Sequence, residues 1–145
     1  MLVAGILLTS LAAFGIVRYG SVHTALLRLQ DYDVTLDDAY IDFGTAAAGQ
    51  TIERIVVVRN WSGSTVRVVG WPRTCPLSVR SNLPLEIPPG ESRPVTVEMR
   101  VLDATDGVLT IDTALWTDSA KAPSLPYRVG CRVANPSRAA VTSGQ

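Results

Sequence analysis

Residues 94–101, PVTVEMRV, alternate between apolar and polar side chains, and this alternation decides the fold class of the chain. Val95, Val97 and Met99 fall on one side of an extended backbone, and the residues between them fall on the other. Side chains along a β-strand point to its two faces in turn, so this stretch predicts a strand with one buried face and one face in water. Such half-buried strands are typical of antiparallel sheets.

The same period of two recurs through the chain from Tyr40 onward. Thr51–Arg59 (TIERIVVVR) is rich in β-branched residues and predicts a mostly buried strand. In Pro88-Pro89-Gly90-Glu91, Pro89 presets φ for a type II turn and Gly90 supplies the positive φ that this turn needs. Other strands are expected at residues 40–43, 66–71, 77–79, 85–87, 109–115 and 127–133. We therefore predict an all-β antiparallel sandwich of seven or eight strands over residues 40–133.

A second feature is the N-terminal segment Leu2–Val17 (LVAGILLTSLAAFGIV), which carries no charge and ends at Arg18. A helix of this length covers about 24 Å, whereas a full membrane span takes about 20 apolar residues. Arg18 can snorkel to the headgroups, and residues 19–27 can continue the helix into the interface. We expect residues 1–30 to form one N-terminal transmembrane or signal helix with a juxtamembrane helix.

Whether this segment is cleaved stays open at the sequence level. A signal peptide carries basic residues before its apolar run and a small-residue cleavage site after it. Only the terminal amine precedes Leu2, and neither Arg18-Tyr19-Gly20 nor Ser21-Val22-His23 forms a clean cleavage site. We therefore favour an uncleaved anchor that contacts the membrane through Leu2–Val17. A cleaved segment would make the rest of the chain a secreted domain.

Charge excludes one class of partner. Lys+Arg and Asp+Glu number thirteen each, so the chain lacks the clustered basic excess that nucleic-acid binding requires. An acidic stretch follows the anchor, and no tight glycine turn accompanies it, as a calcium loop would need. It consists of Asp31, Asp33, Asp37, Asp38 and, at the start of the sandwich, Asp42. We expect a solvated acidic linker at residues 31–39, and a frayed, disordered tail at residues 134–145.

Cys75 and Cys131 are the only cysteines. A disulfide between them would suit an oxidising compartment. Cys131 also alternates with Val129 and Val133, which equally fits a small buried hydrophobe. Both interpretations stay open, and the pair is a candidate disulfide.

Catalytic and metal chemistry are not indicated. His23 is the sole histidine and lies next to the apolar segment, outside the predicted sandwich. A hydrolytic triad needs a base, and a closed tetrahedral metal site needs more ligands than two cysteines. We expect no catalytic, cofactor-binding or metal-binding residues, no cofactor, and no enzymatic activity.

Tryptophan is enriched in binding hot spots, so the three tryptophans are candidates for recognition. Trp61 is the best surface candidate, because it lies in a turn by composition (Asn60–Ser64). At least one of Trp71 and Trp116 is expected instead to pack at the edge of the sandwich. Asn60-Trp61-Ser62 also fits an N-glycosylation sequon.

Several short motifs follow one another along residues 40–133. They are Asp42-Phe43-Gly44, Gly49, Asn60, Cys75, Pro88-Pro89-Gly90-Glu91 and Gly130. In this order they resemble a bacterial family of immunoglobulin-like domains of unknown function, related to ASH and major sperm protein type sandwiches. The family often has Cys-x-Cys where this chain has Thr74-Cys75-Pro76-Leu77, so no paired-cysteine metal or redox site is carried over.

The resemblance also bears on orientation. Arg18 and Arg28 follow the apolar segment and no basic side chain precedes it, which by the positive-inside rule places the sandwich in the cytoplasm. Members of the family are typically exported, so the resemblance implies an extracytoplasmic domain, periplasmic in a bacterium.

From these features we expect a membrane-anchored, non-catalytic module that binds an unknown protein partner on the extracytoplasmic side. The alternative is a structural or assembly subunit of a membrane complex. In that case the transmembrane helix makes the main contacts through its small residues Gly5, Thr9, Ser10 and Gly15.

Overall fold

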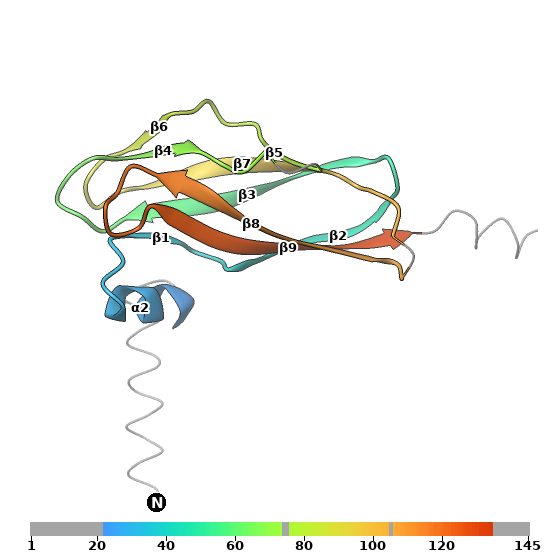
Figure 1. Cartoon of the computed structure of the whole chain (residues 1–145), viewed down its shortest axis with the longest axis horizontal. Helices are drawn as coiled ribbons and strands as arrows, with labels where there is room; N and C mark the ends of the chain where they lie inside the picture. The colour runs from blue at the N-terminus through green and yellow to red at the C-terminus, as the bar shows by residue number, and fades with distance from the viewer. Residues whose placement is uncertain (1–21, 74–75, 105, 135–145) are drawn as a thin grey trace, which may run out of the picture.

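The computed structural model describes residues 22–73, 76–104 and 106–134. These residues form one helix and nine strands (Figure 1). In chain order they are α2 (Val22–Leu29), β1 (Val34–Leu36), β2 (Tyr40–Ala47), β3 (Thr51–Asn60), β4 (Val66–Gly70), β5 (Leu77–Val79), β6 (Leu85–Ile87), β7 (Ser92–Arg100), β8 (Val108–Thr117) and β9 (Ser124–Ala134). The predicted all-β class is confirmed, and the strand count of seven or eight is wrong, because the described residues hold nine.

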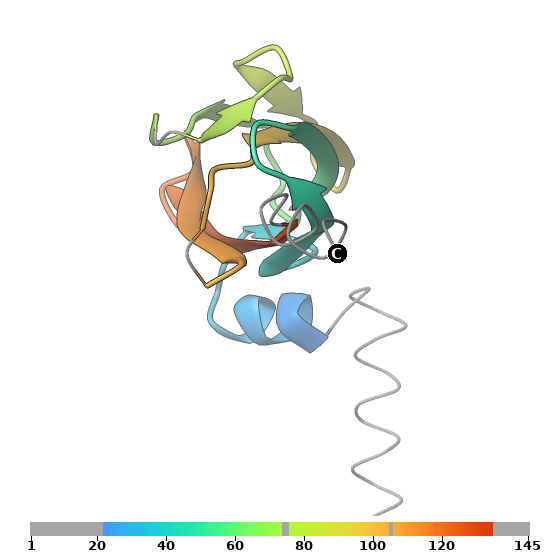
Figure 2. The same ribbon diagram turned by 90° about the vertical axis from the view of Figure 1, so that its right-hand side faces the viewer.

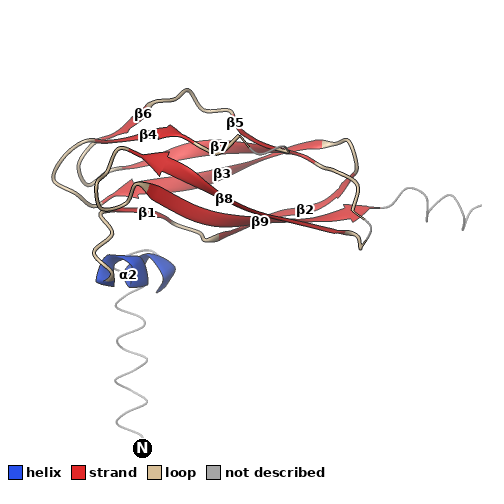
Figure 3. Cartoon of the chain, in the orientation of Figure 1, coloured by secondary structure: helices blue, strands red, loops and turns tan. Residues whose placement is uncertain are grey.

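The strands form two facing sheets, which lie one behind the other in the view of Figure 3. A four-stranded sheet has the order β1-β3-β7-β5, and a five-stranded sheet has the order β2-β9-β8-β4-β6. Seen from the end of the sandwich, the two sheets curve around a common interior (Figure 2). All pairs are antiparallel except β2 with β9, which run parallel. The two strands lie far apart in the chain, so the long connection that a parallel pair needs is available.

The strand that was not predicted is β1. It lies inside residues 31–39, for which we predicted a linker. Val34, Thr35 and Leu36 are buried, and β1 pairs with the end of β3. The aspartates on either side are tied to the domain: Ser119 Oγ donates to Asp33 Oδ1 at 2.6 Å, and Arg59 Nη2 lies 3.4 Å from Asp37 Oδ2. The acidic side chains therefore anchor this short strand rather than hold it in solvent.

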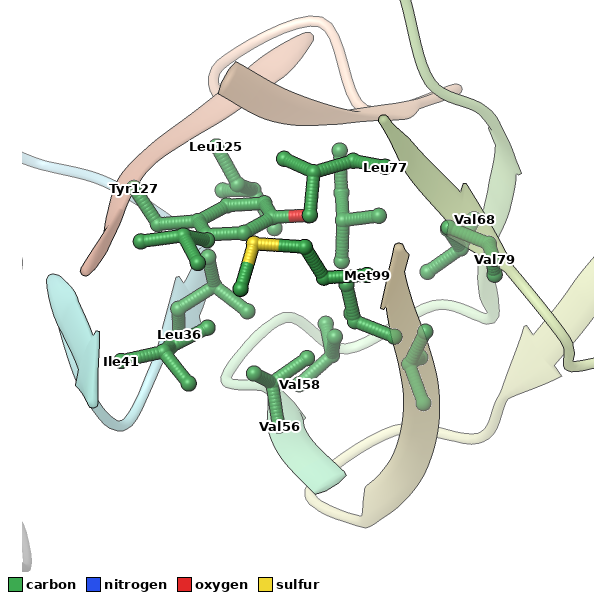
Figure 4. Close-up of a cluster of buried hydrophobic side chains, with 14 of the residues drawn as sticks. Leu36, Ile41, Val56, Val58, Val68, Leu77, Val79, Met99, Leu125 and Tyr127 are labelled. Carbon is green, nitrogen blue, oxygen red and sulfur yellow. The ribbon is translucent and has the colours of Figure 1, made fainter. Parts of the chain in front are cut away.

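The core lies between the sheets and follows the predicted alternation. Val95, Val97 and Met99 of β7 are buried, as expected, and so are alternate residues of β9 from Tyr127 to Val133. Figure 4 shows side chains of both sheets, among them Met99 and Tyr127, pointing into one cluster.

The predicted turn at residues 88–91 is also present. Gly90 has a φ of 72°, and the Glu91 amide donates to the Pro88 carbonyl at 3.1 Å. This is the hydrogen bond and the positive φ of a type II turn. The turn directs the chain from β6 into β7, and so from the five-stranded sheet into the four-stranded one.

Helix α2 lies beside the sandwich, near β1 (Figure 1). It ends in a Schellman motif: the Tyr32 amide donates to the Leu27 carbonyl and the Asp31 amide to the Arg28 carbonyl, with Asp31 at a φ of 66°. Val22, Leu26 and Leu29 are exposed, and 83% of the surface of Leu29 is accessible to solvent. Their spacing places them on one face of the helix.

Two expectations fall on residues that the structure does not describe. The apolar segment Leu2–Val17 and the tail after Ala134 lie outside the described residues. Within those residues, no helix has the length and hydropathy that a membrane span requires.

Candidate functional site

A groove of about 570 Å³ lies at one edge of the five-stranded sheet. Its walls are the end of β4 (residues 69 and 70) with residues 71 and 73 that follow it, the segment from β5 toward β6 (residues 79–83), and Trp116 of β8. We call this feature the tryptophan groove. It brings Trp71 and Trp116 together from positions that are far apart in the sequence.

A close contact between β4 and β8 shapes this groove. Gly70 pairs with Trp116 across the two strands, next to an irregularity in the ladder after Val68. A Cβ built on Gly70 would lie 3.3 Å from Trp116 Cε3, so the indole ring lies against the bare backbone. Trp116 keeps 45% of its surface exposed, and Val69 is exposed beside it. The groove therefore presents a mixed surface to solvent, in which Trp116 and Val69 lie beside polar side chains such as Arg73 and Asn82.

The edge of the sheet is uncovered at this point. The β4–β6 ladder ends at the pair Val68 and Leu85. The residue before Leu85 is Pro84, which has no N–H and cannot continue the ladder. Strand β6 lies beside β4 only as far as Val68. Among the described residues, Val69 and Gly70 consequently have no strand partner on that side of β4.

The charged groups of the groove are both cationic. Arg73 and Arg80 line it, and no carboxylate does. Arg80 Nε lies 3.4 Å from Glu98 Oε2 and 3.7 Å from Glu53 Oε1, so its charge is partly balanced. Arg73 is exposed and has no carboxylate within ion-pair distance in the described part of the chain. The potential inside the groove is therefore positive on the side of Arg73.

Trp71 contributes an unusual polar atom to the groove wall. Its Nε1 is buried, and among the described residues it has no hydrogen-bond acceptor. A buried N–H without an acceptor is costly, by about 1–3 kcal/mol.

Trp61, the residue that the sequence favoured as a surface candidate, lies elsewhere. Its Nε1 donates to Thr35 Oγ1 of β1 at 2.9 Å. The guanidinium groups of Arg28 and Arg59 each lie 5.5 Å from its ring centroid. Trp61 thus joins α2, β1 and β3. Whether it also contacts a partner stays a prediction.

The sequon residue Asn60 is fully buried, with 0% of its surface exposed. Its Nδ2 donates to the carbonyls of Ser64 and Ile87 at 2.8 and 2.9 Å, and its Oδ1 accepts from Ser62. The side chain organises the turn after β3. In the folded chain the amide nitrogen is therefore out of reach of a glycosylating enzyme.

Of the two cysteines, the structure describes Cys131, and Cys75 lies outside the described residues. Cys131 is buried in β9, and burial raises the pKa of its thiol. The candidate disulfide stays a prediction. A thiol count on the denatured chain, with and without prior reduction, would decide it.

His23 lies on α2, well apart from the tryptophan groove. It lines a cavity of about 50 Å³ with Leu27, Tyr32, Leu36, Leu125 and Pro126. Within the described residues, no three His, Cys, Asp or Glu side chains are grouped so that they could hold a metal ion.

The groove was not predicted from the sequence, although the alternation of residues in β8 indicated that Trp116 is exposed. Leu109, Ile111 and Leu115 share the inward face of β8, so the next residue, Trp116, must point outward. The approach of Trp71 to Trp116 depends on how β4 pairs with β8, and no local pattern predicts that.

Comparison with known proteins supports the fold. No family model matches this chain, and no curated protein sequence does. Among solved structures, the ASH / PapD-like domain 7 of human CEP192 is similar, with a TM-score of 0.55 and 12% identity over 71% of this chain and 86% of that one. The YadV chaperone is similar with a TM-score of 0.52 and 11% identity, over 77% of this chain and 59% of that one.

A protease is also similar in fold. The Vibrio cholerae VesB protease matches with a TM-score of 0.56 and 15% identity, over 76% of this chain. This chain spans only 36% of VesB, and less than two thirds of YadV. At these identities the likeness concerns the fold alone. The chain has an immunoglobulin-like fold of the kind found in ASH/PapD-like domains, while the bacterial family suggested by its motifs stays a prediction.

Proposed function

We propose that the chain is a membrane-anchored, non-catalytic immunoglobulin-like module that binds another protein on the extracytoplasmic side. The observation that carries this proposal is the tryptophan groove, where exposed aromatic surface lies beside an uncovered sheet edge. Tryptophans concentrate binding energy in protein interfaces, and an open strand edge can pair with another chain.

The fold is consistent with this role, since the CEP192 domain and the YadV chaperone share it. Fold alone does not define function, so the argument rests on the groove. As for catalysis, the sole histidine, His23, lines a separate apolar cavity rather than the groove. A groove without a histidine or a carboxylate is better suited to binding than to acid–base chemistry.

Two features support the membrane anchor. Leu2–Val17 is uncharged, and the exposed residues Val22, Leu26 and Leu29 follow it on one face of α2. A helix with one apolar face can lie in the membrane interface, with that face toward the acyl chains. In this arrangement α2 would connect the anchor to the sandwich. The extracytoplasmic placement rests on the family resemblance of residues 40–133.

The alternative places the partner contact in the apolar segment itself. Site-specific photo-crosslinking in cells separates the two. A photoreactive side chain would replace Val69 beside the groove, Leu8 in the apolar segment, or, as a matched exposed control, Ile55 of β3. We expect a discrete protein adduct from position 69 and none from position 55. Adducts from position 8 alone would support the assembly subunit instead.

Protease protection tests the placement. If the domain lies outside the cytoplasm, protease added to spheroplasts should cleave within residues 30–134 while cytoplasmic markers stay intact. Cleavage only after the inner membrane is breached would contradict this part of the proposal.

A further inference from the structure

We infer that the tryptophan groove binds an extended acidic peptide segment, which continues the five-stranded sheet beyond the point where β6 ends. This inference rests on the proposed function and names the class of partner. The segment would pair with the backbone of Val69 and Gly70, place a large apolar side chain against Trp116, and direct a carboxylate toward Arg73.

The backbone argument starts from the interrupted edge. Strand β6 covers β4 only at Val66–Val68, and Pro84 prevents a further pair. The groove begins at Val69, the next residue along β4. An added chain would therefore occupy the same sheet position as β6, one step farther along. Strand addition of this kind supplies main-chain hydrogen bonds that do not depend on the sequence of the partner.

The side-chain argument comes from the glycine at position 70. With no Cβ there, the Trp116 ring settles on the β4 backbone and leaves a hollow bordered by Trp71, Leu83 and Val69. The groove volume of about 570 Å³ falls within the range of about 300–1,000 Å³ that is usual for binding pockets. The lining is mixed, and its apolar part around Trp116 and Val69 favours an apolar side chain on the incoming segment.

Charge decides the rest of the partner's chemistry. Arg73 and Arg80 are the charged groups of the groove, and Arg73 has no ion-pair partner among the described residues. A carboxylate next to the apolar side chain would complement Arg73, whereas a lysine there would be repelled. The chain's own C-terminal sequence, ANPSRAAVTSGQ, has no acidic side chain and is a poor occupant. Its acidic stretch is held elsewhere, by contacts such as Asp33 with Ser119.

The test uses the three indole N–H signals of the ¹⁵N-labelled full-length chain in detergent micelles. Trp71→Phe and Trp116→Phe variants assign the signals. The probe is a capped synthetic peptide of alternating threonine and valine, with one phenylalanine and, two positions later, one glutamate. Control peptides replace the phenylalanine by alanine or the glutamate by lysine. Trp61 is an internal control, because its N–H is bonded to Thr35 outside the groove.

We expect the probe to shift the Trp71 and Trp116 signals and to leave Trp61 in place. The lysine peptide should bind about threefold to tenfold more weakly, since an exposed attraction becomes a repulsion. Arg73→Glu should reverse this preference. Arg132→Glu, which changes an exposed arginine of β9 outside the groove, should leave it unchanged. Gly70→Val should abolish the shifts, because a side chain there pushes the Trp116 ring off the β4 backbone and changes the hollow beside it.

Three results would overturn the inference. They are unmoved Trp71 and Trp116 signals with every peptide, equal affinity for the glutamate and lysine peptides, or shifts that follow the concentration of the chain alone, as a second copy in the groove would produce. If peptides fail while position 69 still forms its adduct in cells, the peptide inference fails and the proposed function stands. If the adduct is also lost, both fail.

Discussion

The Tyr40 side chain of β2 lies across Gly130 of the neighbouring strand β9 and fills the space that a side chain at position 130 would need. Residue 130 has the outward orientation of the exposed Arg128 and Arg132, yet it is buried. The tyrosine ring therefore covers the bare backbone of the sheet. Trp116 lies over Gly70 in the same way on strands β8 and β4, so two aromatic–glycine pairs occur in this sheet.

This relationship predicts that Gly130→Ala destabilises the chain when Tyr40 is present and stabilises it when Tyr40 is removed. A Cβ at Gly130 would lie 2.7 Å from Tyr40 Cζ, so Gly130→Ala forces the ring away and should cost about 1 kcal/mol. In a Tyr40→Ala background the space is open. The same substitution should then stabilise by about 0.4–1 kcal/mol, because alanine has less freedom in the unfolded chain. Urea unfolding of the four variants measures the coupling.

Gly63→Ala is the matched control, since a Cβ there meets nothing within 4 Å. It should change stability by less than about 0.5 kcal/mol. If Gly130→Ala had the same effect with and without Tyr40, the two residues would not be coupled, and this explanation would be wrong.

A second prediction concerns Asn60. Asn60→Ala removes the donor to the Ser64 and Ile87 carbonyls and the acceptor of Ser62, all of them contacts of a fully buried side chain. We expect a loss of about 2–3 kcal/mol in the free energy of unfolding, because the buried Ile87 carbonyl and the part-buried groups of Ser62 and Ser64 lose their partner. Asn82→Ala, at an exposed position, should cost less than about 0.5 kcal/mol. A small effect at Asn60 would mean that water replaces its hydrogen bonds.

The elements that the sequence predicted well are those in which local pattern and burial agree. In β7 and β9, period-two alternation alone identifies the buried face, and the structure confirms it at Val95 and Val129. Gly90 was likewise predictable, since a type II turn requires a positive φ at that position.

The elements that were missed depend on contacts between distant residues. β1 is three residues long and flanked by aspartates, and its burial follows from pairing with β3 and from the Asp33–Ser119 hydrogen bond. The contacts of Trp61 with Arg28 and Thr35 likewise join separate segments. In the groove, the register of β4 on β8 brings Trp71 near Trp116. Each of these contacts joins residues far apart in the sequence, so no short stretch of sequence predicts them.

A third prediction concerns alkaline pH. Burial raises the pKa of Tyr127 to about 12, against an ordinary value of 10.0. Above pH 10 the unfolded chain loses this proton while the folded chain keeps it, so the contribution of Tyr127 is complete below pH 10 and declines toward pH 12. Over that interval the loss should reach about 2–3 kcal/mol. Burial also raises the pKa of Cys131, which gives a slope of the same sign.

Unfolding free energies measured from pH 9 to 12 check this. In the Tyr127→Phe variant the unfolding free energy should decline less between pH 10 and 12 than in the parent chain. Tyr40→Phe changes an exposed tyrosine and should show the same decline as the parent chain. Identical slopes in both variants would show that Tyr127 is not the group responsible.

The last prediction concerns the bulge in β2, where the register with β9 shifts between Asp42 and Thr45. Arg54 of β3 holds this bulge. Its Nη2 donates to the Phe43 carbonyl at 3.2 Å, its Nε donates to the Asp42 carbonyl at 3.4 Å, and its guanidinium group lies 5.7 Å from the Phe43 ring centroid. Lysine keeps the charge but cannot span both carbonyls. Arg54→Lys should therefore cost about 1–2 kcal/mol.

Arg132→Lys supplies the control for this substitution, because the side chain is exposed on β9 and should tolerate the change within about 0.5 kcal/mol. Gly44→Ala tests the same bulge from its backbone. Gly44 has a φ of 75°, a conformation that costs alanine about 1 kcal/mol. If both bulge variants unfold at the same urea concentration as the parent chain, Arg54 does not hold the bulge. In that case the contacts of Phe43 with the core would suffice to fix the register of β2 on β9.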